Sequence, residues 1–310
     1  MPTDRPAIVQ EAIDFFKLDS NAELDQRREE LADLEFEAGC HWDPKVKADR
    51  EADGKPCLEI DLLSGPLNQI EGQSNESRAG ITIGANKPGT APEAAGLLQG
   101  FARGIEQQSG AQDVYQHAVR RCSRAGRAGW RILSEYEDDE SRDQVLRLEW
   151  VDNWFAVYLD PTYKKQDGSD RKKALIVDDL THDRYTELHG ESDLGAGLTE
   201  FQSIGDSPPE WITKERVRVA EYFKIKETKR VKIWFSDGSE VFEDELPTSG
   251  RGKKAKPILP EGVTETGRRK VTQKKCCWYL INAIEVLDER ELPIPYIPIV
   301  EIEGERRNID

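Results

Sequence analysis

VRVAEYFKIKETKRVKIWFSDGSEVFE, at residues 217–243, alternates apolar and polar side chains, which is the period of a β-strand. Asp237 and Gly238 stand between two such runs, and this dipeptide is a strong hairpin signal. Another alternating run, KVTQKKCCWYLINAIEVLD, follows at 270–288. We therefore expect the last third of the chain to be mainly antiparallel sheet.

Helical periodicity prevails before this segment. Apolar residues recur at helical spacing over 20–39, after an expected capping box of Ser20 and Glu23. The polar link at 41–56 has a proline near each end and is expected to be a connector. A second helix is expected over 66–75, where Pro66 suits the first turn.

A pair of helices is predicted over 91–125. The first carries an apolar face of Leu97, Leu98, Phe101 and Ile105. After Gly126 the period changes to two, which predicts an antiparallel strand pair over 129–150, and GITIG at 80–84 predicts a short strand. We expect the Phe101 face to be buried against a sheet built from 129–150 and 215–285.

Helices come first and strands follow, without regular alternation, so the predicted class is α+β, with a helical N-terminal half packed on antiparallel sheets. Three parts are expected. Residues 1–56 form a helical segment with its connector, 57–214 hold the helical hairpin and a mixed α/β portion, and 215–310 are β-rich.

The composition excludes several classes of protein. Of 310 residues, 37% are hydrophobic and 34% are charged, and the net charge of -16 divides into -13 over residues 1–160 and -3 over 161–310. The chain lacks both a 20-residue apolar run and a secretory signal at its N-terminus, so neither a membrane span nor secretion is expected. The five cysteines, two of them adjacent, fit no disulfide framework and suit a reducing compartment. The acidic balance argues against a protein that coats DNA.

Catalytic and cofactor motifs are not found in the sequence. The chain has no GxxxxGK[ST] phosphate loop, no GxSxG elbow and no Cys-His signature. His182 and His189 flank a predicted short helix without a nearby third metal ligand. Asp179 is expected to cap that helix or to face water. Cys276 and Cys277 lie in a strand, where one of them must face the core. We expect no catalytic residues, no cofactor and no metal.

Two basic features remain. Arg120, Arg124, Arg127 and Arg131 have helical spacing and suit a helix C-terminus. Residues 251–275 hold nine Lys and Arg against Glu261 and Glu265 alone. This segment is either a mobile solvated loop or a contact with nucleic acid or an acidic neighbouring subunit. The candidate contact residues are Arg251, Lys253, Lys254, Lys256, Arg268, Arg269 and Lys270.

The order of segments resembles that of the portal proteins of tailed bacteriophages, specifically the long portals of short-tailed phages. Seven collinear blocks carry the resemblance, and they cover most of residues 20–304. They are HWD (41–43), LLSGPLNQIEGQSNESRAGITI (62–83), AGRAGW (125–130) with RILSEYEDDE (131–140), VDNWFAVYLDPTYKKQDGSD (151–170), VRVAEYFKIKE (217–227), CCWYLINAIEVLDE (276–289) and IPYIPIVEIEG (294–304).

The resemblance implies a non-enzymatic subunit of a homo-oligomeric ring, usually of twelve copies, at one capsid vertex of the virion. Double-stranded DNA is packaged through such a ring by a terminase, in assembly within the host cytoplasm, and is later ejected. The major capsid or scaffolding protein and a tail adaptor are the implied partners. Family members continue into a stem, clip, tunnel loop and crown that this sequence lacks, so it resembles the outer wing portion. A soluble phage or host enzyme with an unrecognised site is the alternative.

Overall fold

The computed structural model describes residues 6–77, 82–85, 92–138, 140–165, 167–190, 216–249, 256–257, 263–282 and 284–304. Its α-helices are α1 (Ala7–Ala22), α2 (Leu24–Glu37), α3 (Pro44–Ala52), α4 (Ser64–Glu76), α5 (Pro92–Gln108), α6 (Ala111–Ala125) and α7 (His182–His189). Its strands are β1 (Arg127–Tyr136), β2 (Gln144–Trp150), β3 (Val157–Leu159), β4 (Lys173–Thr181), β5 (Arg216–Phe235), β6 (Glu240–Phe242), β7 (Thr248–Ser249), β8 (Lys256–Pro257), β9 (Glu265–Ile281), β10 (Val286–Leu292) and β11 (Ile299–Glu303). Short 3-10 helices are η1 (Trp154–Ala156) and η2 (Glu243–Glu245).

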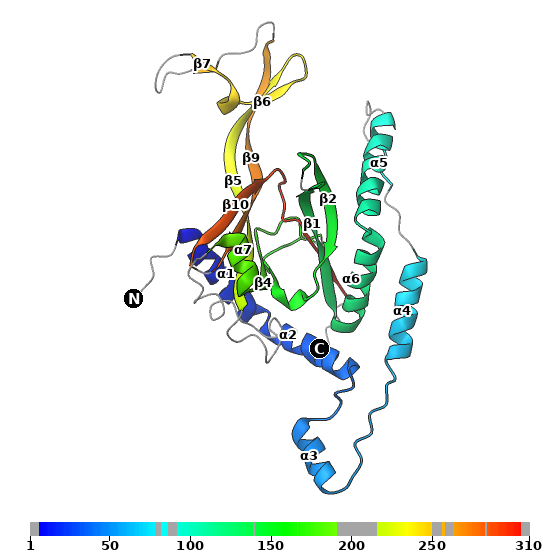
Figure 1. Ribbon diagram of the computed structural model, residues 1–310. Helices are drawn as coiled ribbons and strands as arrows, with labels where there is room; N and C mark the ends of the chain where they lie inside the picture. The colour runs from blue at the N-terminus through cyan, green and yellow to red at the C-terminus, as the bar shows by residue number, and fades with distance from the viewer. Residues whose placement is uncertain are drawn as a thin grey trace.

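Two antiparallel sheets form the body of the molecule, with helices on their outer sides (Figure 1). The larger sheet has the strand order β10-β9-β5-β4-β3, with β6 also paired to β5, and the smaller has the order β11-β1-β2. α1 packs on one face of the larger sheet, the smaller sheet lies toward the other face, and α6 packs on the smaller sheet. The layers are therefore helix, sheet, sheet and helix, and the predicted α+β class is confirmed.

The main core lies between α1 and the larger sheet. Ile13 and Phe16 of α1 are 0% and 2% exposed, and the Phe16 ring meets the Tyr158 ring of β3 edge-on at a centroid distance of 4.6 Å. Alternate residues of the strands complete this face. The buried side chains of this core are Val9, Ala12, Ile13, Phe15, Phe16, Ala156, Tyr158, Leu175, Val177, Ala220, Tyr222, Cys277, Tyr279 and Ile281.

The opposite face of the larger sheet packs toward the smaller sheet. Trp154 of η1 and Ile299 of β11 are buried there together. The Trp154 ring lies so close to β1 that a Cβ atom on Gly129 would come within 2.3 Å of it, so only glycine fits at this position. Because both faces of β9 are covered, Cys276 and Cys277 are both buried, one in each core.

α6 leads directly into the smaller sheet. Gly110 and Gly126 bound the helix, with φ angles of 57° and 83° that favour glycine. Val114 and Ala118 are 1% and 0% exposed, whereas α5 buries a single residue, Ala95. The turn at Gly126 places the last residues of the helix beside the first residues of β1.

Buried charges join the N-terminal helices to the sheets. Arg27 of α2 is 0% exposed, and its guanidinium donates to the carbonyl oxygens of Phe155 at 2.6 Å and Val157 at 2.7 Å. It also pairs with Glu23 at 3.1 Å and lies 4.1 Å from the centre of the Tyr158 ring. One side chain of α2 thereby fixes η1 and β3, which are far away in the sequence.

Arg127, the first residue of β1, is the second cation of this buried cluster. Its guanidinium donates to the two carboxylate oxygens of Glu23 at 2.8 and 2.9 Å, and also to Glu30. Glu301 of β11 lies 3.8 Å from Arg127 and pairs with Arg171 as well. These carboxylates each contact an arginine, which is the condition under which a protein interior tolerates charge.

Two local predictions in the N-terminal half are wrong. Ser20 and Glu23 do not cap a helix, because α1 continues through Ser20 and the Glu23 carboxylate binds the buried arginines. The expected connector at 41–56 contains α3. Asp43 caps this helix by accepting from the amide of Lys45 at 2.8 Å, so the Asp-Pro pair starts a helix there instead of breaking one.

The expected strand at 80–84 is not formed over residues 82–84, and residues 80 and 81 lie outside the described part. The division of the chain at residues 56 and 214 stays a prediction. Strands from the second and third expected parts lie side by side in both the larger and the smaller sheet, since β4 pairs with β5 and β1 pairs with β11.

The expected burial of the apolar face of α5 is wrong. Leu97, Leu98 and Phe101 are 66%, 57% and 68% exposed. The helical pair is present as α5 and α6, but α6 makes the contact with β1, and the expected single sheet of 129–150 and 215–285 is two sheets. The core helix of the larger sheet is instead α1.

Replacing Arg27 by methionine should destabilise the fold by about 3–5 kcal/mol, because the change leaves Glu23 and two carbonyl oxygens without their buried partner. Urea unfolding followed by circular dichroism measures the loss. The neighbouring Arg28 pairs with Asp25 at the surface, so Arg28→Met is the control and should change stability by less than about 0.5 kcal/mol. Equal effects of the two substitutions would contradict the buried role of Arg27.

Replacing Phe101 by alanine should cost less than about 1 kcal/mol in the unassembled chain, because the side chain is already exposed. Phe16→Ala is the comparison and should cost about 3–5 kcal/mol, because that ring is buried in the main core. The same urea experiment ranks the two variants. A larger loss of unfolding free energy for Phe101→Ala than for Phe16→Ala would show that the α5 face is buried in the core.

Candidate functional site

The part of the predicted basic segment from residue 265 onward lies along a two-stranded ribbon. β4 pairs with β5 only as far as Lys224, and β10 pairs with β9 only from Cys276 onward. Residues 225–235 and 265–275 therefore continue as a ribbon beyond the larger sheet (Figure 1). We call these two stretches the ribbon.

A small apolar cluster stabilises the tip of the ribbon. Ile233, Phe235 and Leu246 are buried there, and Val241 of β6 packs against them. An isolated two-stranded hairpin is marginally stable in water, so the folding back of β6 and η2 onto β5 supplies the third element that the ribbon needs.

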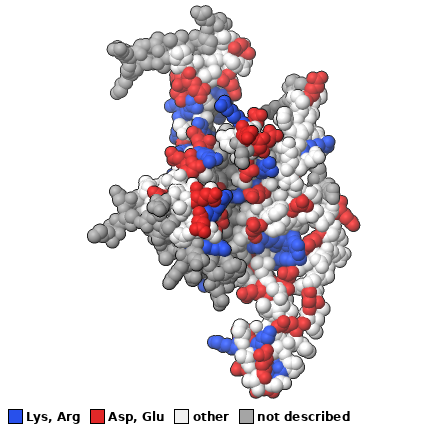
Figure 2. Space-filling view, in the orientation of Figure 1, with Lys and Arg blue, Asp and Glu red and all other residues white. Residues whose placement is uncertain are grey.

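Most cations of the ribbon are neutralised by acidic side chains nearby. Arg230 pairs with Asp244 at 2.6 Å and Glu245 at 2.9 Å, and Lys232 pairs with Glu240 at 2.6 Å. The hydrogen bond from Lys232 holds the pKa of the Glu240 carboxyl below its ordinary value. Figure 2 shows basic and acidic side chains interleaved over the part of the molecule where β5 and β9 project.

The seven predicted contact residues fall into three groups. Arg251, Lys253 and Lys254 lie outside the described residues, and of Lys256 the structure describes only the backbone, in β8. Arg268 pairs with Glu243 and Glu265, both at 2.9 Å. Arg269 and Lys270 are exposed on β9 and form no ion pair with any described residue. These two residues are the free cations that the described part of the segment offers, together with Lys229 on β5.

The second basic feature is not a surface stripe. α6 ends at Ala125, so Arg127 and Arg131 belong to β1. Arg124 pairs with Glu37 at 3.0 Å and also with Glu71, while Arg127 is part of the buried cluster. Helical spacing in the sequence therefore does not put these arginines on one face.

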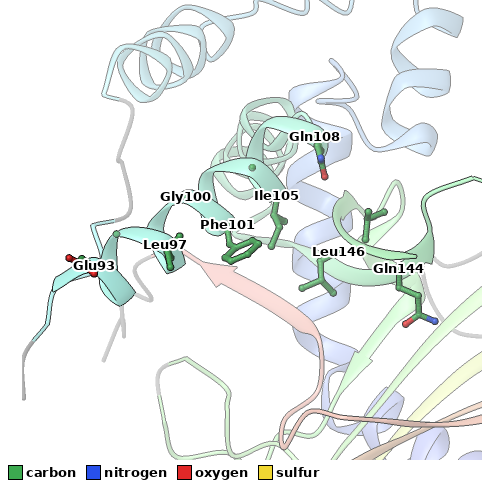
Figure 3. A pocket seen from close by; sticks show the side chains of 11 residues that line it. Glu93, Leu97, Gly100, Phe101, Ile105, Gln108, Gln144 and Leu146 are labelled. Carbon is green, nitrogen blue, oxygen red and sulfur yellow. The ribbon is translucent and has the colours of Figure 1, made fainter. Parts of the chain in front are cut away.

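An apolar groove lies between α5 and β2, as Figure 3 shows. Its volume is about 1020 Å³, and Leu97, Phe101 and Ile105 of α5 face Leu146 of β2 across it. The other residues that line it are Glu93, Gly96, Gly100, Gly104, Gln108, Gln144 and Val145. The helical period of the α5 face was visible in the sequence, but its placement beside an open groove was not.

The other candidate residues have structural partners. Asp179 does not cap α7; its carboxylate accepts from Arg218 at 2.7 and 2.6 Å, and the Thr181 hydroxyl caps the helix. Burial raises the pKa of the Cys276 thiol to about 12, which is opposite to what a nucleophile needs. Among the described residues, no group of three or more His, Cys, Asp or Glu side chains is placed to hold a metal ion.

The buried charge cluster has the perturbed groups that often mark an active site. Burial raises the pKa of the Asp19 carboxyl to about 8, with the nearby Glu23 carboxylate adding to the shift and Arg27 and Arg127 opposing it. Asp19 and Arg27 are 0% exposed and Arg127 is 5% exposed, so a substrate does not reach them in this conformation. The geometry therefore gives the cluster a structural role.

Comparison with known proteins gives a match over almost the whole chain. The sequence profile of the phage P22-like portal proteins matches residues 13–310. The chain belongs to this family. The resemblance inferred from the seven sequence blocks is thereby confirmed.

A curated portal protein, from Acyrthosiphon pisum secondary endosymbiont phage 1, is 23% identical to this chain over 297 residues. The alignment covers 88% of this chain and 39% of that relative, so the chain spans about two fifths of the relative's length. Portal proteins are structural components of phages. In the described part of this portal-family chain, every helix is too short or too polar to cross a membrane.

Replacing Asp19 by asparagine should stabilise the fold increasingly as the pH rises. The folded chain holds a proton on Asp19 up to about pH 8, whereas the unfolded chain releases it near pH 4, so the parent loses stability between these values. The variant has no proton to lose at this position. Urea unfolding of both proteins at pH 5, 6, 7 and 8 measures the difference, which should grow in favour of the variant. A constant difference over this range would show that Asp19 is already ionised at pH 5.

Proposed function

We propose that the chain is a subunit of a phage portal ring at one vertex of the capsid, through which double-stranded DNA is packaged and later ejected. The family match over residues 13–310 carries this proposal. The ring usually has twelve copies in portals of this kind. A terminase, the major capsid or scaffolding protein and a tail adaptor are the proposed partners, with assembly in the host cytoplasm and a final place in the virion.

The charge distribution supports a conduit. The net charge of -16 repels DNA, and the ribbon cations that have acidic partners present little free positive charge. A wall of this kind lets a polyanion pass without retaining it. We assign the chain to the outer wing portion of the portal, since the sequence blocks it contains precede the stem in the family it resembles.

The free cations of the ribbon are the part of the surface that we propose does bind a polyanion. Arg269 and Lys270 are exposed and have no acidic partner among the described residues, and the sequence between β7 and β9 adds further cations. We propose that this segment contacts packaged DNA or the acidic N-terminal half of a neighbouring subunit. Both are polyanionic surfaces, so the contact weakens with salt.

The chain should form closed rings with a single rotational symmetry. Electron microscopy of negatively stained particles and native mass spectrometry measure the symmetry and the copy number. A chain that stays monomeric up to its solubility limit would contradict the portal role. ATPase or nuclease activity that survives purification and is lost on a single carboxylate substitution would favour the alternative, a soluble enzyme.

Neutralising Arg269 and Lys270 together should weaken ring assembly or retention of double-stranded DNA, because both are exposed ribbon cations without an acidic partner among the described residues. The loss should shrink above physiological salt, where the Debye length falls below about 8 Å. Salt titrations of assembly, by light scattering, and of DNA binding, by fluorescence anisotropy, tell the two partners apart. Arg28→Ala with Arg184→Ala removes two exposed cations elsewhere and is the control. Curves identical to the parent's in both assays would leave the ribbon as a solvated excursion.

A further inference from the structure

An arm of the chain, residues 40–63, extends away from the sheets and exposes a row of apolar side chains. α3 lies apart from the body, and the segment that follows it runs as an extended trace back toward α4 (Figure 1). Leu58, Ile60 and Leu62 are 71%, 67% and 77% exposed. Alternate side chains of an extended segment point the same way, so these three form one row.

The acidic residues that alternate with this row, Glu59 and Asp61, form hydrogen bonds within the arm and to the start of α4. The Glu59 carboxylate accepts from Lys47 Nζ at 3.2 Å, and the Asp61 carboxylate accepts from the amides of Leu63 and Ser64, both at 3.0 Å. These bonds turn the acidic side toward α3 and α4. The apolar row therefore faces away from the arm, in a conformation that is already ordered.

The α5–β2 groove is a second apolar surface that the described part of the chain leaves exposed. Gly96, Gly100 and Gly104 recur every four residues along α5 and leave one side of the groove open, since a Cβ atom on any of them would meet nothing within 4 Å. Phe101 and Leu146 are 68% and 46% exposed beside this open side (Figure 3). An exposed apolar groove of this size on a water-soluble surface indicates a binding partner.

One wall of the groove is the free edge of a sheet. β2 is the last strand of the smaller sheet, and no described strand pairs with its outer side. The amide of Leu148 donates outward to the Ser109 hydroxyl at 3.0 Å, while its neighbour on β1, Ile132, donates to Pro298 on the opposite side. In an antiparallel ladder this orientation repeats every second residue, so the backbone groups of Leu146 and Gln144 also point outward.

We propose that the segment Leu58–Leu62 of one subunit enters the α5–β2 groove of a neighbouring copy. There it adds a strand to the edge of β2 and buries its apolar row against Phe101 and the open glycine side of α5. This is strand addition, in which backbone hydrogen bonds give affinity and alternate side chains fill apolar pockets. The inference rests on the proposed ring and names the contact that closes it.

A second copy of this chain is the occupant that the two surfaces favour. Each chain carries an extended apolar row and a groove with a free strand edge, and in Figure 1 α3 of the arm lies well apart from α5 and β2, which line the groove. A surface that fits a different surface of an identical chain makes a head-to-tail contact, and repeated contacts of this kind form a ring when the rotation between neighbours closes. Every subunit in the ring then gives one arm and receives one.

Two variants test the contact from its two sides. The arm variant, Leu58→Ser with Ile60→Ser and Leu62→Ser, removes the apolar row, and Gly100→Leu fills the groove. Each should raise the concentration needed for assembly by at least about tenfold, measured by light scattering and native mass spectrometry. Gly100→Leu adds apolar surface, so a groove that is merely adhesive would instead promote association.

Matched controls exclude effects on folding. Gly72→Leu adds the same side chain at another open helical glycine, in α4, and Leu188→Ser removes an exposed apolar side chain from α7. Both should assemble as the parent does. Circular dichroism melts of the unassembled variants should match the parent's, because all the substituted residues are exposed or have open space around them.

Mixing the two variants gives a decisive result. The arm variant keeps an intact groove and Gly100→Leu keeps an intact arm, so the mixture should form 1:1 heterodimers but no rings. Rings formed by each variant alone, as by the parent, would overturn this inference and leave the portal role standing. If Gly100→Leu alone fails to assemble while the arm variant assembles as the parent does, the groove binds something other than the arm. That result would also overturn the inference. A parent that never assembles would contradict the portal role itself.

Discussion

The placement of the sheets depends on two arginines that the fold has taken out of water. Arg27 donates to the carbonyl oxygens of Phe155 in η1 and Val157 in β3. Arg127, at the start of β1, binds the Glu23 carboxylate, which Arg27 also contacts. Removing either guanidinium leaves buried acceptors or a buried carboxylate unpaired, which a protein interior tolerates poorly. Because each buried charge needs its partner, the cluster favours the arrangement of α2 and the two sheets in which these ion pairs form. The aromatic and aliphatic side chains buried between α1 and the larger sheet add hydrophobic stabilisation.

The surface follows a different rule from the interior. Arg230, Lys232 and Arg268 of the ribbon are paired with acidic side chains of the same hairpin, so these three cations present little free positive charge. Apolar side chains, by contrast, are left uncovered on the arm and on α5. For a subunit that we propose to sit in a ring around DNA, this division is reasonable. Charge that is paired within the subunit does not hold the polymer, and apolar surface that is unpaired within the subunit is available for contacts with other proteins.

The sequence predicted what is local and missed what depends on distant partners. Alternation over 217–243 identified β5 and its hairpin, and the change of period after Gly126 identified β1 and β2, because these signals come from neighbouring residues. The choice of core helix was wrong, since amphipathicity shows that a helix has an apolar face but not which surface covers it. Arg127 was expected at a helix C-terminus, but it begins β1, and its carboxylate partners lie about a hundred residues earlier in the chain. Of the predicted contact residues, Arg269 and Lys270 are exposed. Arg268 is paired with Glu265, three residues before it, and with Glu243, which reaches it through the fold of β6 and η2.

β5 runs without interruption from the covered sheet to the tip of the ribbon, over 20 residues and a length of about 65 Å. Its hydrogen bonds to β9 are perpendicular to this length. A pull along the ribbon axis therefore shears many of these bonds at the same time, whereas a sideways pull at the tip opens them one after another. The ribbon is thus mechanically anisotropic: it is stiff toward loads directed into the body and compliant toward loads across it. Force that reaches the tip along the strands is delivered to the cores on both sides of β9.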